Sequence, residues 1–192
     1  MTQFIALCGY PRTGKTEVQK IISRIYGHVP VDDAAPLREA TKILYGLTDW
    51  HVATQEGKSS LVNIGNRSLT VRKLLGDLGN HLEINDEFHL PRQALKTCLE
   101  QEPDGRFVFG SVRRNQTRFF KQTGSAIVIE ITRQGCLPTG NFDFYNRDNI
   151  DISIENPHDD RHGTGMHGVD AQTELERRVR AALDPIAEPR ST

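Results

Sequence analysis

Near the start of the chain, residues 9–16 read Gly9-Tyr10-Pro11-Arg12-Thr13-Gly14-Lys15-Thr16. Two glycines enclose four residues, and a lysine and a threonine follow, as in the pattern G-x-x-x-x-G-K-[ST]. Such a loop turns its backbone N–H groups inward around phosphate oxygens, and the helix that follows directs the positive end of its dipole at the anion. The sequence therefore predicts a phosphate-binding loop at residues 9–16.

The segments on both sides of this loop have the pattern that it requires. Residues 4–8 form an apolar run without charges, which is typical of a strand buried on both faces. Apolar residues recur at helical spacing between residues 18 and 25, so we expect a helix over 14–26 that stops at Gly27. An ordinary glycine-rich turn does not account for this order of strand, loop and helix.

Strands and helices alternate along the rest of the chain. The expected strands are 28–31, 106–110, 126–131 and 150–154, and the expected helices are 34–45, 70–83, 87–101, 115–122 and 171–183. This alternation predicts an α/β fold of the P-loop NTPase type, a three-layer α/β/α sandwich with a mainly parallel sheet. The polar stretch 48–68 is interpreted as a loop-rich insertion, and the histidine-containing segment 158–168 as a surface loop rather than a metal site.

The composition limits the class of protein. A hydrophobic fraction of 36% suits a globular domain, and a formal net charge of -1 provides no overall field for stable nucleic-acid binding. No apolar run reaches the ~18 residues of a membrane span. The three cysteines lack metal or disulfide spacing, so we expect a reduced cytoplasmic protein in which Cys8 is a core residue rather than a nucleophile.

The residues of the phosphate loop have distinct expected roles. Lys15 would reach the β- and γ-phosphates of ATP, and the Thr16 hydroxyl would ligate Mg²⁺. Gly14 would allow the backbone to approach the phosphates closely. The Arg12 side chain could bind nucleotide or face solvent. The remaining loop residues expected to bind ATP are Gly9 and Thr13.

Several later segments carry a resemblance through their order along the chain. They are AAPLR at 34–38, LYGLT at 44–48, TVRKLLGDLG at 70–79, SVRRNQ at 111–116, IEITR at 129–133 and DISIEN at 151–156. In this order they resemble the deoxynucleoside monophosphate kinases of bacteriophages, which are relatives of adenylate kinase and dephospho-coenzyme A kinase. The resemblance covers about residues 3–156 of the chain.

The resemblance implies a nucleoside monophosphate kinase-like enzyme. Such an enzyme transfers the γ-phosphoryl group of ATP, with Mg²⁺, to a dNMP and produces dNDP and ADP. It would form a single domain over 1–192, with an acceptor-binding insertion around 45–100 and a lid-like segment around 134–147. Its partners would be small-molecule substrates, with no membrane, in the cytoplasm of a host cell if a phage encodes it. A homodimer is compatible with the sequence.

Arginines are the residues that the resemblance assigns to phosphate groups. ATP and an anionic acceptor repel each other, so cations must surround both. By position, Arg38, Arg72 and Arg113 would bind the acceptor phosphate. Arg133 ends a strand before the lid-like segment and would close on the transferred phosphoryl group. The alternative for each arginine is an exposed surface charge.

Two further residues follow expected strands. Asp33 comes after the strand at 28–31, and ligands bind at the carboxyl ends of the strands in such sheets. It would orient the acceptor oxygen or hold a Mg²⁺-bound water, and the compatible alternative is an N-cap for the helix at 34–45. The resemblance places Asn156 near the adenine of ATP.

The chain departs from the family pattern at three acidic positions, which are occupied by Ala35, Ser111 and Gln116. The lid-like segment also lacks the histidine-containing pattern of the family. Two alternatives therefore stay open. One is a dephospho-coenzyme A kinase or adenylate kinase-like enzyme, and the other is a regulatory protein that binds nucleotide without catalysing transfer.

Overall fold

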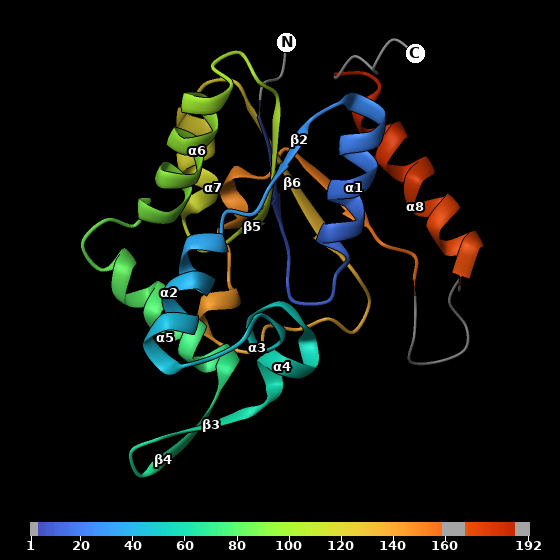
Figure 1. Cartoon of the computed structure of the whole chain (residues 1–192). Coiled ribbons are helices and arrows are strands. Elements are labelled where there is room, and N and C mark those ends of the chain that lie inside the picture. Colours follow the sequence, from blue (N-terminus) through green and yellow to red (C-terminus); the bar gives the residue numbers. More distant parts are fainter. Residues whose placement is uncertain (1–3, 159–167, 187–192) are drawn as a thin grey trace.

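Five parallel strands form the central sheet of the protein, which a computed structural model describes over residues 4–158 and 168–186 (Figure 1). The strand order across the sheet is β2-β5-β1-β6-β7, and every neighbouring pair is parallel. The strands are β1 (Phe4–Cys8), β2 (Val29–Val31), β5 (Phe107–Val112), β6 (Ala126–Thr132) and β7 (Ile152–Glu155).

Helices cover both faces of this sheet. One face packs against α1 (Lys15–Tyr26) and α8 (Gly168–Leu183), and the other packs against α6 (His89–Gln101) and α7 (Gln116–Gln122) (Figure 1). Successive side chains of a strand point to opposite faces, so Ile5 and Leu7 of β1 join the first core. Phe4, Ala6 and Cys8 join the second core. The predicted α/β/α sandwich is confirmed, and Cys8 is a fully buried core residue, as predicted.

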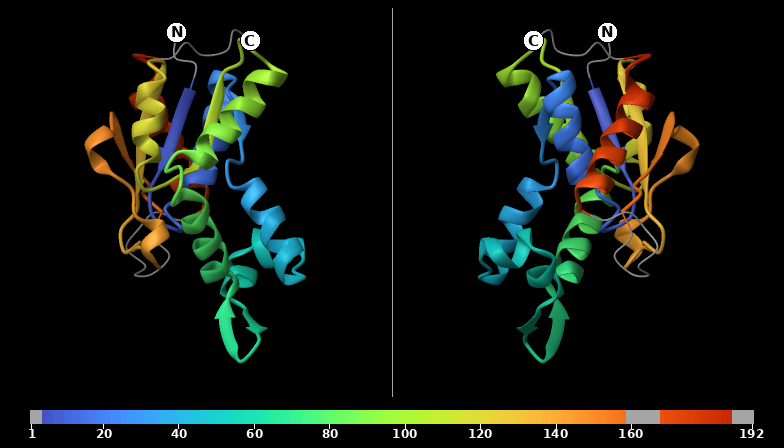
Figure 2. Two further views of the ribbon diagram at one scale, coloured as in Figure 1. Left: turned by 90° about the vertical axis from the view of Figure 1, so that its left-hand side faces the viewer. Right: turned by 90° about the vertical axis from the view of Figure 1, so that its right-hand side faces the viewer.

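Residues 35–83, called the insertion from here on, lie beyond the carboxyl ends of the strands, and a two-stranded hairpin projects from them (Figures 1 and 2). The elements of the insertion are α2 (Ala35–Tyr45), α3 (Asp49–Ala53), α4 (Gln55–Ser59), β3 (Leu61–Ile64), β4 (Arg67–Thr70) and α5 (Val71–Glu83). The prediction of a loop-rich segment at 48–68 is wrong. Thr48 forms a capping box with His51, the Thr54 side chain caps α4, and Gly65 has the φ of 60° that a two-residue hairpin turn requires.

The segment between β6 and β7 crosses to the insertion and contains two short 3₁₀ turns, η1 (Asn141–Asp143) and η2 (Arg147–Asn149). Phe142 packs against α5 at Gly79, where a Cβ atom would lie only 2.7 Å from the Phe142 ring. The Arg114 N–H donates to the Phe144 carbonyl over 2.5 Å, and the Asn146 N–H donates to the Arg114 carbonyl over 2.7 Å. Backbone pairing and a close aromatic contact therefore hold this segment against the rest of the fold.

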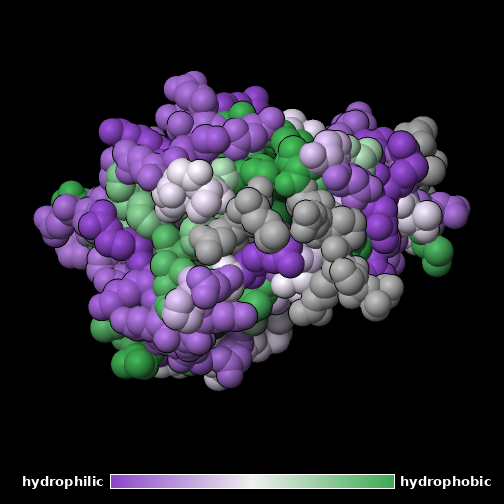
Figure 3. All heavy atoms as spheres, turned by 90° about the horizontal axis from the view of Figure 1, so that it is seen from above, coloured by the Kyte–Doolittle hydropathy of each residue, from purple (hydrophilic) through white to green (hydrophobic). Residues whose placement is uncertain are grey.

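The end of the molecule opposite the insertion has a mostly hydrophilic surface (Figure 3). Within residues 4–158 and 168–186, no helix is both long and apolar enough to cross a membrane. The surface loop predicted at 158–168 lies outside the described residues apart from its two ends.

Candidate active site

The phosphate loop joins β1 to α1 and requires glycine at two of its positions. Gly9 has a φ of 142°, and a Cβ atom there would lie 2.3 Å from the Ile131 carbonyl oxygen. Gly14 has a φ of 98°, and a Cβ atom there would lie 2.2 Å from Nδ2 of Asn156. Both positions combine a left-handed backbone with a close neighbour, so glycine alone fits them.

Lys15 is the first residue of α1, and its side chain folds back over the loop. Its Nζ donates to the Gly9 carbonyl over 2.7 Å and to the Tyr10 carbonyl over 2.9 Å. Burial and the positive charge of Arg113 lower the pKa of Lys15 from 10.5 to about 7. The ammonium therefore lies in a place where additional negative charge, such as a phosphate group, would stabilise it.

The other residues of the loop differ in burial and in their contacts. The Thr13 side chain is buried and donates to the Tyr10 carbonyl over 2.9 Å. The Thr13 carbonyl accepts a 2.9 Å hydrogen bond from Asn156, which follows β7 and is buried against the loop. Thr16 and Arg12 are exposed, and Arg12 has a left-handed φ of 68°. The structure therefore brings Asn156 to the phosphate loop through a side-chain contact.

The residues of the loop fit a magnesium nucleoside triphosphate. The two glycines allow the loop backbone to adopt its left-handed conformation close to β6 and Asn156, and the loop leads directly into the N-terminus of α1. Lys15 and the backbone N–H groups would hold the phosphates, and the exposed Thr16 hydroxyl would hold the Mg²⁺. The described residues contain no group of three or more His, Cys, Asp or Glu side chains suited to a metal ion.

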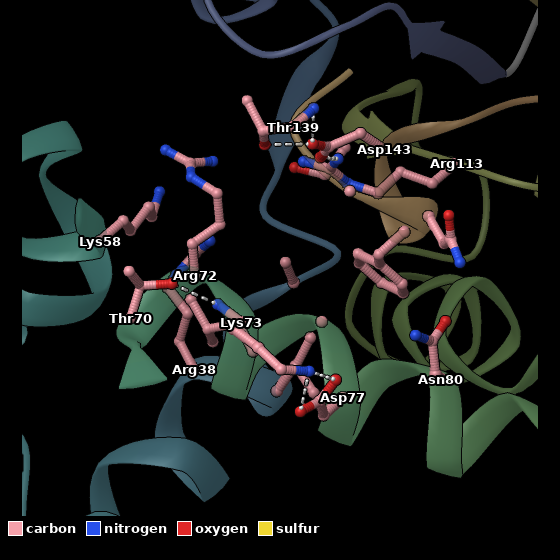
Figure 4. Close-up of a pocket in the computed structure, with 18 residues that line it drawn as sticks. Arg38, Lys58, Thr70, Arg72, Lys73, Asp77, Asn80, Arg113, Thr139 and Asp143 are labelled. Carbon is pink, nitrogen blue, oxygen red and sulfur yellow. Dashed lines mark hydrogen bonds and ion pairs between the residues drawn. The ribbon is translucent and has the colours of Figure 1, made fainter. Parts of the chain in front are cut away.

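A cleft of about 440 Å³ lies between the sheet and the insertion (Figure 4). Arg113 and Asp143 belong to its lining, and the charges of both act on Lys15, so the cleft adjoins the phosphate loop. Five cationic side chains line it, from α2, α4, α5 and the end of β5. They are Arg38, Lys58, Arg72, Lys73 and Arg113.

The three predicted acceptor-binding arginines therefore meet in one cleft. Arg38 forms an ion pair with Asp32, and Arg72 donates to the Gln55 side chain over 2.7 Å. Burial is the main cause that lowers the pKa of Arg38 and of Arg72, and the neighbouring charge of Arg113 lowers both further. These cations lie close together and are partly removed from water, which is the arrangement that an anionic ligand stabilises.

Arg133 lies at the phosphate loop and is not part of the cleft lining. Its guanidinium donates to the Arg12 carbonyl over 3.3 Å and lies 3.3 Å from Nδ1 of His158. It follows directly after β6, which ends at Thr132. The structure thus brings Arg133 to the phosphate loop and Arg113 to the cleft.

Asp33 is buried at the end of β2, with 4% of its surface exposed. Burial raises the pKa of its carboxyl group from 3.8 to about 6, and the opposing effects of Arg113 and of hydrogen bonds with Ser111 are smaller. Among the described residues, its Oδ1 atom has no hydrogen-bond partner. The N-cap interpretation of Asp33 is wrong, because Ala34 is the N-cap of α2 and the Ala34 N–H donates to Asp32 over 3.3 Å.

Two departures from the family pattern have a structural explanation. Ser111 supplies hydrogen bonds to the buried Asp33 carboxyl group. The Gln116 side chain accepts from the Arg113 N–H over 2.9 Å and donates to the buried Glu83 carboxylate over 2.5 Å. A carboxylate at position 116 would face that of Glu83, so the amide suits this environment better than an acid.

Sequence reasoning missed three residues around the cleft. Lys58 lies on α4, a helix of five residues that has no periodic pattern to reveal it. Glu83 and Asp143 bond to partners that are 33 and 30 positions away in the chain. The Thr54 cap could have revealed α4, but the sequence contains no local signal for the two long-range contacts.

Of the comparisons with known proteins, only the comparison with solved structures finds similar proteins. No family model matches the chain, and no curated protein matches it. An unliganded sugar kinase from Janibacter sp. HTCC2649 is 10% identical, with a TM-score of 0.46, over 96% of this chain and 95% of that one. A shikimate kinase from Aquifex aeolicus is 14% identical, with a TM-score of 0.43, over 94% of this chain and 96% of that one.

Proposed function

We propose that the protein is an ATP-dependent phosphotransferase whose acceptor is a phosphorylated small molecule, and specifically a dNMP that it converts to dNDP. One observation carries this proposal: a cleft with five cationic side chains adjoins a complete phosphate loop. A neutral acceptor would not require so many positive charges around one cleft, whereas two polyanions that must come together would.

Different residues of the chain would bind the ATP phosphates, the Mg²⁺ and the transferred phosphoryl group. Mg-ATP supplies the transferred phosphoryl group. Lys15 and the loop N–H groups hold its phosphates, and the Thr16 hydroxyl would hold the Mg²⁺. Arg113 lines the cleft and its charge acts on Lys15, which suits a contact between the acceptor and the transferred group. Arg133 would stabilise the same group from the side of Arg12.

We further assign the segment around 45–100, which includes most of the insertion, to acceptor binding. The segment around 134–147 would act as a lid. Residues of both segments line the cleft, and Phe142 packs against α5. Both would belong to a single kinase domain that spans residues 1–192. Such an enzyme would act in the cytoplasm, in a bacterial host if a phage encodes it.

Asp33 favours a second candidate function. An acceptor phosphate already carries an anionic oxygen, whereas an acceptor hydroxyl must lose a proton when it attacks. Asp33 has a buried oxygen with no hydrogen-bond partner among the described residues and a pKa of about 6, so it could accept that proton. A kinase that phosphorylates the hydroxyl of an acceptor bearing another phosphate group, as a dephospho-coenzyme A kinase does, would use both Asp33 and the cationic cleft.

A panel of acceptors tests both candidates. ADP release from Mg-ATP would be measured with each dNMP, each NMP and dephospho-coenzyme A, and with unphosphorylated sugars as controls. The proposal expects one or a few dNMPs to stimulate release. Stimulation by dephospho-coenzyme A alone would select the second candidate. Binding of ATP without stimulation by any acceptor would favour a regulatory nucleotide-binding protein and contradict the kinase proposal.

A further inference from the structure

Lys58 is held in place by the packing of α4 against α3 and α5. A Cβ atom at the preceding residue, Gly57, would lie 2.1 Å from the Trp50 carbonyl oxygen, so the two short helices touch backbone to backbone. The Gly57 N–H donates to Thr54 over 2.9 Å, and the Val71 N–H donates to the Ser60 carbonyl over 3.1 Å. The backbone that carries Lys58 is therefore fixed relative to α5.

The cations of the cleft differ in their partners. Lys73 pairs with Asp77 over 2.9 Å, and Arg38 and Arg113 each pair with a carboxylate. Arg72 bonds to the neutral Gln55 side chain. Within the part of the chain that the structure describes, no carboxylate lies within ion-pair distance of Lys58 or Arg72. Neither of these two charges is thus held in an ion pair with a described residue, although the charge of the Asp143 carboxylate acts on Arg72.

These two charges lie on the same wall of the cleft. Figure 4 shows Lys58 on α4 and Arg72 on α5 at one side, facing Arg113 and Asp143 at the other side. Burial, followed by the charges of Arg38, Arg72 and Arg113, lowers the pKa of Lys58 to about 8. The environment therefore disfavours the ammonium unless an anion joins it. A phosphomonoester carries a charge of about −1.5 to −2 at neutral pH, which matches these two cations.

We propose that Lys58 and Arg72 form the binding site for the dianionic phosphomonoester group of the acceptor, with Lys58 as a direct ligand supplied by the insertion. This inference rests on the proposed function, because it identifies the group that the acceptor must carry. It also has a consequence for selectivity. A phosphodiester, which has a single negative charge, leaves one of the two cations unneutralised and should bind more weakly.

Methyl phosphate and dimethyl phosphate are suitable probes, because they differ in charge and carry no nucleobase. Their binding would be measured by ³¹P NMR titration at pH 7.5, with saturating Mg-ADP to occupy the phosphate loop. The variants are Lys58→Met, Lys58→Arg and, as a control with the same loss of charge outside the cleft, Lys96→Met on α6, which pairs with Glu100 over 3.8 Å.

The wild type should bind methyl phosphate at least about tenfold more tightly than dimethyl phosphate, and Lys58→Met should lose about tenfold in affinity for methyl phosphate. Lys58→Arg should retain affinity within about threefold, and Lys96→Met should match the wild type. Wild-type affinity in Lys58→Met, or equal affinity of the wild type for the two probes, would overturn the inference. If the wild type transfers no phosphoryl group to any acceptor but Lys58→Met still loses methyl phosphate binding, the kinase proposal is rejected and the anion site is retained.

Discussion

The Arg113 guanidinium donates a 2.5 Å hydrogen bond to the Asp143 carboxylate, and this ion pair fastens the end of β5 to the lid-like segment. Asp143 also accepts hydrogen bonds from the N–H of Thr139 over 2.9 Å and from its hydroxyl over 2.5 Å. The Arg113 guanidinium lies 5.4 Å from the centroid of the Phe142 ring. These contacts hold Arg113 at the cleft in the protein alone, which would lower the entropic cost of binding the proposed acceptor.

The substitution Asp143→Asn tests this ion pair. Burial disfavours the charged Asp143 carboxyl, but the hydrogen bonds from Thr139 and the charge of Arg113 outweigh it and lower its pKa. The pair therefore contributes stability above the unfolded pKa of about 4, and this contribution is lost as the pH falls through the lower folded pKa. Urea denaturation at pH 7.5 should show a loss of about 2 kcal/mol, which becomes smaller at pH 3. An equal loss at both pH values would contradict the ionic origin.

The contact between Gln116 and Glu83 gives a second prediction. Gln116→Glu places a second carboxylate within about 3 Å of the buried first one, so one of the two must bind a proton. The variant should lose about 2 kcal/mol of stability at pH 7.5 and recover part of it near pH 5, where the shared proton binds more readily. The double variant Gln116→Glu/Glu83→Gln exchanges donor and acceptor and should recover most of the loss. Equal instability of the single and double variants would show that like charge is not the cause.

These two contacts also show how far the sequence could predict the structure. The sequence could predict the phosphate loop and the alternation of strands and helices, because both have local patterns. It could also predict that Arg38, Arg72 and Arg113 lie at one site, because they occur in a known order of segments. The partners of Arg113 and Gln116 lie about 30 positions away, and only the folded chain brings them together.

In the insertion, even structure formed by residues close together in the chain was hard to predict from the sequence. Helices α3 and α4 have five residues each, so they are too short for an apolar period to appear. The hairpin turn at Gly65, by contrast, has the local chemistry of a two-residue loop, so the sequence does contain a signal for it. The position of Lys58 at the cleft depends on how α4 packs against α3, which no local pattern encodes.

Asp33 gives a prediction about pH and stability. Its folded pKa of about 6 lies above the unfolded value of 3.8, so the folded protein binds more protons between these pH values and its stability falls as the pH rises through them. Asp33→Asn removes this cost and should stabilise the protein by about 3 kcal/mol at pH 7.5, with the gain falling toward zero below pH 4. Urea denaturation across this pH range measures the gain. A variant that is less stable than the wild type at pH 7.5 would refute the prediction.

The lowered pKa of Lys15 predicts that the protein takes up a proton when it binds nucleotide. This pKa of about 7 means that the side chain is mostly neutral at pH 8 in the free protein, and the phosphates of ATP should restore its charge. Calorimetry of Mg-ATP binding at pH 8, in buffers of different ionisation enthalpy, should therefore show uptake of close to one proton. Lys15→Arg, which remains charged at this pH, should bind with almost no uptake. Uptake of the same size in both proteins would rule out Lys15 as its source.

The most direct test of the account is transfer of a labelled phosphoryl group. Mg-ATP labelled at the γ-phosphate would be incubated with each dNMP and the products separated, for the wild type and for Lys15→Ala. The account predicts that the wild type forms labelled dNDP from at least one dNMP and that Lys15→Ala forms none above the background. Absence of label in every acceptor with the wild type, or full transfer by Lys15→Ala, would contradict it.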